Sequence, residues 1–273
     1  MKRSRLLHKK TGKTFSFVVA AVIALTIVAG HYQRQQNLYQ DHETVSLGVP
    51  DWKENSASVP TESGLISGIP LYQGEPYAIV NDGQPYFTEN EITDESYVSL
   101  GNLDSLGRCT EATACLGPKT MPADGEERGE IGNVKPTGWC QNKYDCVNGR
   151  YVVNRCHMIG WLLSGLNDEE RNLITGTRYL NLSMLEFEEM TARYIEETGN
   201  HVMYRATPVF GEGEMLARGL LLEGYSVEDE GAEICFNLYF YNVQPGIEFD
   251  YKTGENWYTG EFLDTDSPAV LVE

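Results

Sequence analysis

His157 is the side chain of this sequence best suited to proton transfer near neutral pH. It ends the run Gly149–His157, which is rich in β-branched and aromatic residues and predicts a strand. Because strand side chains alternate between faces, Arg155 shares a face with His157. Cys156 points to the opposite face, which disfavours a Cys156–His157 nucleophilic dyad. Taken alone, an isolated strand histidine is more often a satisfied core residue, and only the residues downstream favour a chemical role.

Oxygen ligands for a metal ion follow this strand. Asn181 lies near the start of a predicted helix that also carries Glu188 and Glu189. At about 100° per residue, Asn181 and Glu188 fall near one line and Glu189 lies about 80° away. Magnesium keeps most of its waters and needs only one or two protein oxygens beside phosphate. From spacing alone, a solvated helix face remains the alternative to a sparse Mg²⁺ site.

One long helix among strands predicts an α+β fold. The helix is expected over residues 178–198, with an apolar stripe on one face and Gly199 as its stop. Strands are expected at 85–88, 149–157, 201–210 and 235–243, and 216–225 is a further candidate strand. Residues 97–106 are expected to be a loop or strand, 158–166 a short helix or turn, and 117–150 mostly loop. His201, at a strand start, is expected to be structural or solvated.

The N-terminal segment predicts export. Residues 1–13 form a basic head with six cations and no acid, and residues 14–30 form an apolar transmembrane anchor or signal segment. We favour an uncleaved single-pass anchor in the cell membrane with an extracytoplasmic C-terminal domain, and secretion is the alternative. Residues 31–68 are typical of a flexible stalk. The folded domain is expected over 69–255, followed by an acidic tail at 256–273.

The body of the chain is strongly acidic. The full sequence has 40 acidic and 21 basic residues, and removing the six cations of the head leaves 15 against 40, a charge of −25. Such a body repels nucleic acid and anionic lipid at long range. A polyanionic substrate would therefore have to be held locally, by a few arginines and a metal ion.

Six cysteines in an exported chain predict disulfide bonds. Cys109 and Cys115 are six residues apart, as are Cys140 and Cys146, a spacing poorly suited to zinc. The simplest connectivity is two local disulfides, Cys109–Cys115 and Cys140–Cys146. The remaining two cysteines, at 156 and 235, either pair with each other or are buried thiols.

The strand that ends at His157 resembles a family motif. Asn154-Arg-Cys-His157 is similar to the D-R-G-H motif of the DNA/RNA non-specific endonucleases, the ββα-metal or His-Me finger group. The segment Arg171–Asn181 resembles the one in which that family places an orienting Asn and a metal-binding Asn. Gly138-Trp139, Tyr204–Thr207 and Asn242–Gly246 are also similar, so the resemblance spans roughly residues 98–255. Within the family, the membrane-anchored nucleases of competent bacteria are the most similar.

The resemblance implies a ββα-metal core, an antiparallel sheet with one long metal-site helix, and Mg²⁺ as cofactor with Mn²⁺ as a substitute. It implies these roles: His157 as general base, Asn172 as the residue that holds the imidazole or its loop, Asn181 as direct Mg²⁺ ligand, Glu189 as a binder of the metal's water shell, and Arg155 and Arg178 as phosphate contacts. Helical geometry favours Glu188 over Glu189, so both stay open.

Two positions depart from the family motif. Asn154 replaces the Asp and removes a charge that braces the hairpin, and Cys156 replaces the Gly. Since the Cys156 side chain is expected to face away from His157, we expect activity to survive. The arrangement requires His157 and Asn181 to converge on a hydrated cation, with both side chains open to solvent.

These features favour an extracytoplasmic, sequence-nonspecific, Mg²⁺-dependent endonuclease. Its substrate would be DNA, with RNA as a second candidate, recognised through the backbone because no base-reading element is needed. Two other hypotheses remain. The first is a catalytically inactive, membrane-anchored surface module that binds nucleic acid or a cell-wall polymer. The second is a thiol-dependent hydrolase that uses Cys156 or Cys235.

Overall fold

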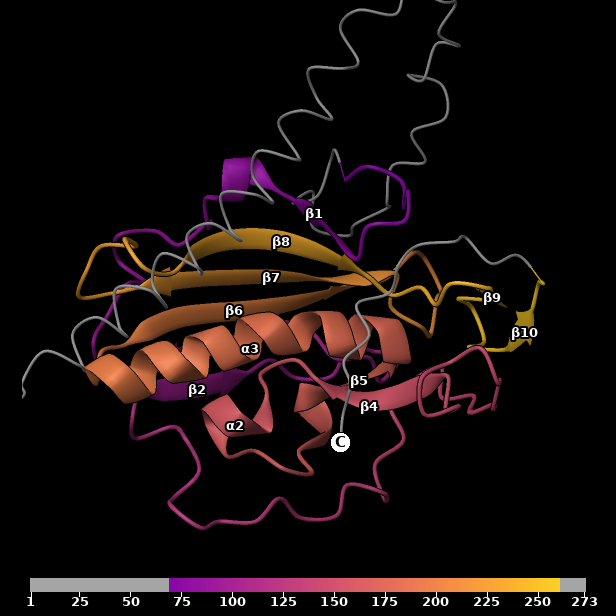
Figure 1. Cartoon of the computed structure of the whole chain (residues 1–273), viewed down its shortest axis with the longest axis horizontal. Coiled ribbons are helices and arrows are strands. Elements are labelled where there is room, and N and C mark those ends of the chain that lie inside the picture. The colour runs from indigo at the N-terminus through magenta and orange to yellow at the C-terminus, as the bar shows by residue number, and fades with distance from the viewer. Residues whose placement is uncertain (1–68, 261–273) are drawn as a thin grey trace, which may run out of the picture. The chain divides into compact units, whose positions relative to one another are not determined.

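The computed structural model describes residues 69–260, which fold around a six-stranded antiparallel sheet (Figure 1). The strand order is β1-β8-β7-β6-β3-β2. The strands are β1 (Tyr77–Ile79), β2 (Tyr97–Leu100), β3 (Ala112–Leu116), β6 (Val202–Val209), β7 (Gly219–Ser226) and β8 (Cys235–Tyr241). The remaining elements are the ribbon β4 (Val153–His157) and β5 (Leu173–Thr177), the ribbon β9 (Ile247–Phe249) and β10 (Asn256–Tyr258), the helices α2 (Trp161–Ser164) and α3 (Arg178–Thr198), and the 3-10 turns η3 (Asn81–Gly83) and η4 (Glu170–Asn172). The expected α+β class is confirmed.

The long helix α3 covers one face of the sheet and has the predicted bounds (Figure 1). Thr177 caps its N-terminus, because the Thr177 hydroxyl accepts a hydrogen bond from Leu180 N at 3.0 Å. Gly199 ends it in the left-handed region at φ 72°, where glycine has no steric penalty. Leu180, Met184 and Ile195 are buried on the face of α3 that contributes to the main core.

The central strands were predictable, and so was β4, whereas several of the other short strands were not. β6, β7 and β8 lie within or beside the expected ranges. The expected strand at 85–88 is wrong, because Tyr86 N donates to the buried Glu223 carboxylate at 2.6 Å instead of joining a ladder. β3 and β5 were not expected.

The ribbon of β4 and β5 leads directly into α3. Its register pairs His157 with Leu173 and Val153 with Thr177, and Thr177 is also the cap of α3. The 15-residue connection between the two strands contains α2 and η4 and returns along the ribbon beside His157. Two strands and a helix thus form one ββα unit that positions the predicted site.

The predicted disulfides are absent: all six cysteines lie in the described residues and all are free thiols. Cys115 lies in the extended strand β3, about 10 Å along it from Ala112 at about 3.3 Å per residue, and Cys109 precedes that strand. Such an extended chain disfavours a disulfide, whose Cα atoms lie within roughly 7 Å. Each thiol donates to a backbone carbonyl instead, Cys109 to Leu173 at 3.2 Å and Cys115 to Thr93 at 3.0 Å. Cys140 and Cys146 are also unpaired.

The domain extends past Glu255, the expected end. β10 pairs with β9, and buried Asn256 donates to the carbonyl of Cys140 at 2.9 Å. The basic head, the anchor and the stalk, together with the tail from residue 261, lie outside the described residues. Among residues 69–260, no helix has the length and apolar character needed to cross a bilayer.

We predict that Asn242→Ala destabilises the junction of sheet, ribbon and helix. The fully buried Asn242 side chain accepts from Thr177 N at 2.7 Å and donates to the carbonyls of Thr175 (3.0 Å) and Ala217 (2.8 Å). Three backbone groups would lose their partners, which costs about 3 kcal/mol in the free energy of unfolding. Urea unfolding measures this cost. Asn90→Ala, at an exposed turn, is the control, with an expected change below about 0.5 kcal/mol.

Candidate active site

His157 lies at the end of β4 with both ring nitrogens in polar contact. Nε2 is 2.8 Å from the carbonyl oxygen of Asn167, and Nδ1 is 3.2 Å from a guanidinium nitrogen of Arg128. A carbonyl can only accept, so Nε2 carries the proton and Nδ1 presents its lone pair to Arg128. His157 is therefore oriented as a neutral imidazole with one basic atom.

The surroundings favour that neutral form. Burial lowers the pKa of His157, and the nearby Arg128 charge lowers it further, while the hydrogen bond to Asn167 acts in the opposite direction. The side chain is only 6% exposed. The expectation that the imidazole is open to solvent is thus wrong, because a loop that carries Arg128 lies over it.

Asn172 holds the chain that follows His157. Its side chain is fully buried, accepts from Ile159 N at 3.0 Å and donates to the carbonyl of Ile159 at 2.9 Å. Its backbone carbonyl also accepts from Met158 N at 2.9 Å. The structure therefore places Asn172 where the resemblance implies an orienting residue.

Cys156 faces away from His157, as expected. Its sulfur lies 3.9 Å from the sulfur of Met184 on α3. A Cβ added to Gly176 on β5 would lie 2.6 Å from the Cβ of Cys156, so the neighbouring strand leaves room for this side chain. Burial raises the pKa of the Cys156 thiol, which disfavours a thiol nucleophile.

Asn181 and Glu188 present side-chain oxygens that accept no hydrogen bond within the described residues. Both side chains are half-buried and neither makes a side-chain hydrogen bond within residues 69–260, whereas Glu189 is exposed. A Cβ on Gly160 would lie 2.7 Å from a carboxylate oxygen of Glu188, so this carboxylate packs against bare backbone. Burial raises its pKa to about 7, and the Arg128 charge acts against that rise.

These donors fit a hard divalent cation. Amide and carboxylate oxygens are what Mg²⁺ prefers, and one or two suffice when water and phosphate complete the shell. Within residues 69–260 no cluster of three or more His, Cys, Asp or Glu side chains is arranged to hold a metal. The set is therefore sparse, and of its two candidate carboxylates Glu188 is half-buried and Glu189 exposed.

The two predicted phosphate contacts differ in their surroundings. Arg155 donates to the carbonyls of Gly132 (2.7 Å) and Val134 and stacks over the Trp139 ring at 4.3 Å, so its guanidinium is engaged by a loop. The buried Nε of Arg178 has no hydrogen-bond partner within the described residues. Arg178 follows Thr177 at the end of the ribbon opposite His157. The four residue steps between the two ends of the ribbon span about 13 Å.

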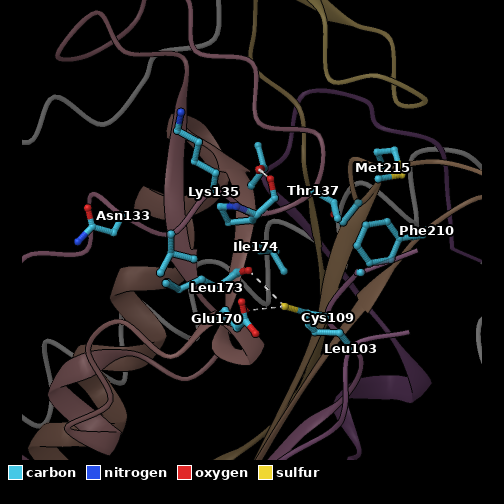
Figure 2. A pocket seen from close by; sticks show the side chains of 15 residues that line it. Leu103, Cys109, Asn133, Lys135, Thr137, Glu170, Leu173, Ile174, Phe210 and Met215 are labelled. Carbon is cyan, nitrogen blue, oxygen red and sulfur yellow. Dashed lines mark hydrogen bonds between the residues drawn. The ribbon is translucent and has the colours of Figure 1, made fainter. Parts of the chain in front are cut away.

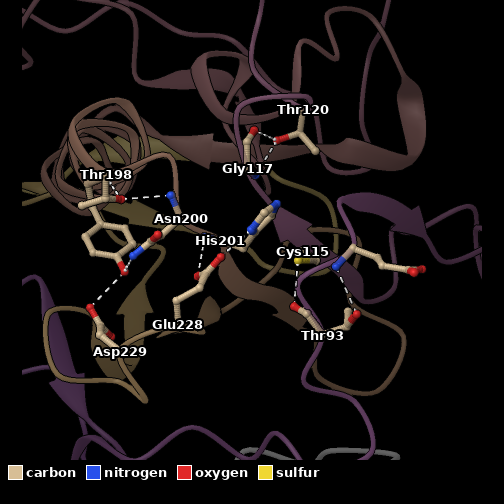
Figure 3. Close-up of polar contacts among 11 residues, drawn as sticks. Thr93, Cys115, Gly117, Thr120, Thr198, Asn200, His201, Glu228 and Asp229 are labelled. Carbon is tan, nitrogen blue, oxygen red and sulfur yellow. Dashed lines mark hydrogen bonds and ion pairs between the residues drawn. The ribbon is translucent and has the colours of Figure 1, made fainter.

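The other body histidine is structural, as expected. His201 contacts Glu228 through its backbone nitrogen and through Nδ1, each at 2.7 Å (Figure 3). This pair ties the start of β6 to the turn after β7.

A cavity of about 280 Å³ lies on the β5 side of the ribbon (Figure 2). Cys109, Glu170, Leu173 and Phe210 are among its lining residues, and none of the predicted site residues is. The cavity reaches Leu173, the strand partner of His157, but the side chains of the predicted chemistry do not line it.

Arg128 is the site residue that sequence reasoning missed. It lies in the loop between β3 and β4, 29 residues before His157, with no periodicity and no motif around it. An arginine among glycines and acids in a loop carries no signal of its own. Only the tertiary contact reveals it.

Together, a ribbon that ends in a neutral histidine and a following helix with an asparagine and a carboxylate define a ββα-metal nuclease. Residues 87–227 match the family of DNA/RNA non-specific endonucleases. This match spans more than half of the chain, and the chain belongs to that family of metal-dependent nucleases.

Solved structures support the fold. NucA from Streptococcus agalactiae, with a bound magnesium ion, is 22% identical with a TM-score of 0.56 over 66% of this chain and 85% of that one. The Sda1 nuclease, with a bound zinc ion, is 21% identical with a TM-score of 0.57 over 67% of this chain and 97% of that one. At this level of identity the likeness shows the shared fold alone.

We predict that His157 titrates below pH 6.5 in the metal-free protein, because burial and the Arg128 charge both oppose its protonation. Unfolded chains would then bind more protons below pH 6.5, so the free energy of unfolding should fall as the pH drops through that value. NMR titration of the ring signals in EDTA, assigned with His157→Gln, measures the midpoint. A midpoint at or above 6.5 would contradict the assigned environment.

Proposed function

We propose that this protein hydrolyses phosphodiester bonds of DNA, without sequence preference and with Mg²⁺, using His157 as general base and Asn181 as metal ligand. The observation that carries the proposal is the hydrogen bond from His157 Nε2 to the Asn167 carbonyl, because it leaves Nδ1 as a directed basic atom. RNA is a second candidate substrate, and Mn²⁺ a candidate substitute for Mg²⁺.

His157 would take a proton from the attacking water at Nδ1. A neutral imidazole whose pKa lies below 6.5 is available as a base at physiological pH. The bond to Asn167 strengthens as the ring becomes positive, since a carbonyl oxygen stabilises the imidazolium N–H. Asn172 would keep that carbonyl in position through its two bonds to Ile159.

Asn181 would hold the cation, with Glu188 or Glu189 near its water shell. When bound, Mg²⁺ supplies charge stabilisation at the phosphate and at the leaving oxygen. The half-buried Glu188 carboxylate has no hydrogen bond within the described residues, which supports its role over that of exposed Glu189. A nearby cation would favour its ionised form.

Binding would rely on backbone phosphates rather than bases. Arg155 and Arg178 are the proposed contacts, and the roughly 13 Å between the two ends of the ribbon would let Arg178 meet a phosphate away from the cleaved one. Because the chain is strongly acidic, binding would be weak and salt-sensitive.

We further propose that the basic head and apolar segment at residues 1–30 anchor the chain in the cell membrane with the nuclease domain outside the cytoplasm. Secretion after cleavage is the alternative. The polar stalk at 31–68 would then separate the domain from the bilayer surface, whose negative charge repels an acidic body.

One observation favours an inactive binding module instead: the imidazole of His157 is buried and Arg128 occupies its free nitrogen. Plasmid incubated with the purified chain, with and without EDTA, separates the two functions. Metal-dependent degradation supports the nuclease, and binding without degradation supports the module.

We predict that His157→Ala abolishes nicking of supercoiled plasmid in Mg²⁺, by at least about 100-fold, because general-base catalysis contributes that much. Gel electrophoresis measures nicking, and circular dichroism checks that the fold is kept. His201→Gln is the matched control, since the His201 side chain bonds to Glu228 away from the ribbon and the variant should leave the rate near wild type. Full activity in His157→Ala would contradict the role of His157 as general base.

We predict that Asn181→Ala raises the Mg²⁺ concentration for half-maximal cleavage by about tenfold or more, because it removes a direct ligand. The pair Glu188→Gln and Glu189→Gln decides which carboxylate supports the metal. Glu188→Gln should give the larger shift, since only Glu188 packs against Gly160. Metal titrations of the cleavage rate measure both. Equal shifts, or a larger one for Glu189→Gln, would reverse the assignment.

A further inference from the structure

The loop between β3 and β4 covers the basic atom of the site. Arg128 lies in this loop and donates to Nδ1 of His157 at 3.2 Å. A guanidinium has five donors and no acceptor, so it uses the lone pair that a general base must offer to water. Nδ1 cannot receive a proton from water while this contact persists.

Few contacts hold the part of this loop around Arg128, residues 123–134, which we call the covering loop. Asn167 Nδ2 donates to the carbonyl of Glu130 at 3.4 Å, and Arg155 donates to the carbonyls of Gly132 and Val134. Residues 123–130 are all exposed and contain no helix or strand. Moving this stretch would expose little apolar surface and break few hydrogen bonds, so the cost of opening is small.

The His157 imidazole is a weaker hydrogen-bond acceptor for Arg128 than a phosphate would be. The imidazole is neutral, whereas a phosphodiester is an anion that accepts two parallel hydrogen bonds from a guanidinium. Within residues 69–260, Arg128 forms no close ion pair with a carboxylate, and the Glu188 carboxylate, whose pKa the Arg128 charge lowers, attracts it only at longer range. An arriving phosphate would therefore compete well for the Arg128 side chain.

We propose that Arg128 is a cap on the general base: in the substrate-free protein it occupies Nδ1 of His157, and the phosphate of an incoming strand draws it away. This inference rests on the proposed function of His157. Without substrate, Arg128 covers Nδ1 of His157. The phosphate of the nucleic-acid strand that is to be cut uncovers it. Opening is independent of base sequence, because only the phosphate is sensed.

A chemical probe tests the cap without any catalysis. Diethyl pyrocarbonate acylates neutral, accessible imidazoles, and peptide mass spectrometry of the full chain in EDTA reads His157 and His201 separately. Arg128→Ala should raise the modification rate of His157 by about tenfold, the gain expected when a largely closed state becomes open. His201 is the internal reference, and Glu127→Ala, the neighbouring exposed residue, is the matched control. An unchanged His157 rate in Arg128→Ala overturns the cap.

A reversible disulfide bond between the covering loop and residue 167 tests whether this loop must move for plasmid cleavage. A Cβ on Gly129 would lie 3.4 Å from Cγ and 2.8 Å from Nδ2 of Asn167, so cysteines at these two positions lie close enough to bond. The oxidised Gly129→Cys, Asn167→Cys protein should cut plasmid about tenfold more slowly or worse, and dithiothreitol should restore its rate. Each single variant and the wild type, oxidised in parallel, control for the native thiols. Equal cutting by the locked and reduced forms overturns the proposal.

The two tests separate failure of the cap from failure of the nuclease function. A wild-type chain that cuts no plasmid refutes the function, yet the modification rates still report the cap. A wild-type chain that cuts normally, with a lock that changes nothing, refutes the cap alone. If the double variant is inactive even when reduced, the modification rates decide.

Discussion

The hydrogen bond between His157 Nε2 and the Asn167 carbonyl is the contact on which the site depends. It fixes the tautomer, and through the tautomer it decides which nitrogen can act as a base. The carbonyl is in place because the connection from β4 to β5 is pinned near both ends. Asn172 clamps Ile159 at one end, and Glu169 accepts from Arg171 at the other. The chemistry thus rests on backbone geometry held by buried amides.

Buried polar side chains also join the ribbon to the sheet and the helix. Asn242, at the end of β8, satisfies backbone groups of β5 and of the segment before β7, and Thr177 caps α3 while its hydroxyl donates to the Val243 carbonyl at 2.7 Å. Such groups are costly to leave unpaired, so the helix cannot shift relative to the ribbon without a penalty. The distance between the base on β4 and the oxygens on α3 is therefore set by the fold, not by a loop.

What the sequence predicted correctly was local. The helix Arg178–Thr198 follows from an apolar stripe, a capping residue and a glycine stop, all within its own length. β5 was missed because it is short and contains Gly176, and its identity as a strand comes from pairing with β4. The disulfide prediction failed for a related reason, since β3 becomes a strand only by pairing with β2 and β6 and so separates Cys109 from Cys115. Gly176 shows the same limit: it makes room for Cys156 across the ribbon, which no local pattern reveals.

The charges around the ribbon explain how an acidic body could engage a polyanion. Most nearby arginines already have partners: Arg150 pairs with Asp145, Arg171 pairs with Glu169, and Arg155 is engaged by loop carbonyls. Among the described arginines next to the ribbon, Arg128 and Arg178 have neither a carboxylate ion pair nor, like Arg155, a pair of loop carbonyls that hold the guanidinium. Arg128 acts on the Glu188 carboxylate without a close ion pair, and the Nε of Arg178 has no hydrogen-bond partner within the described residues, so each can exchange its present surroundings for a phosphate. A nucleic acid would then be attracted only near Arg128 and Arg178. The surrounding negative charge would repel nucleic-acid strands that do not reach these two arginines.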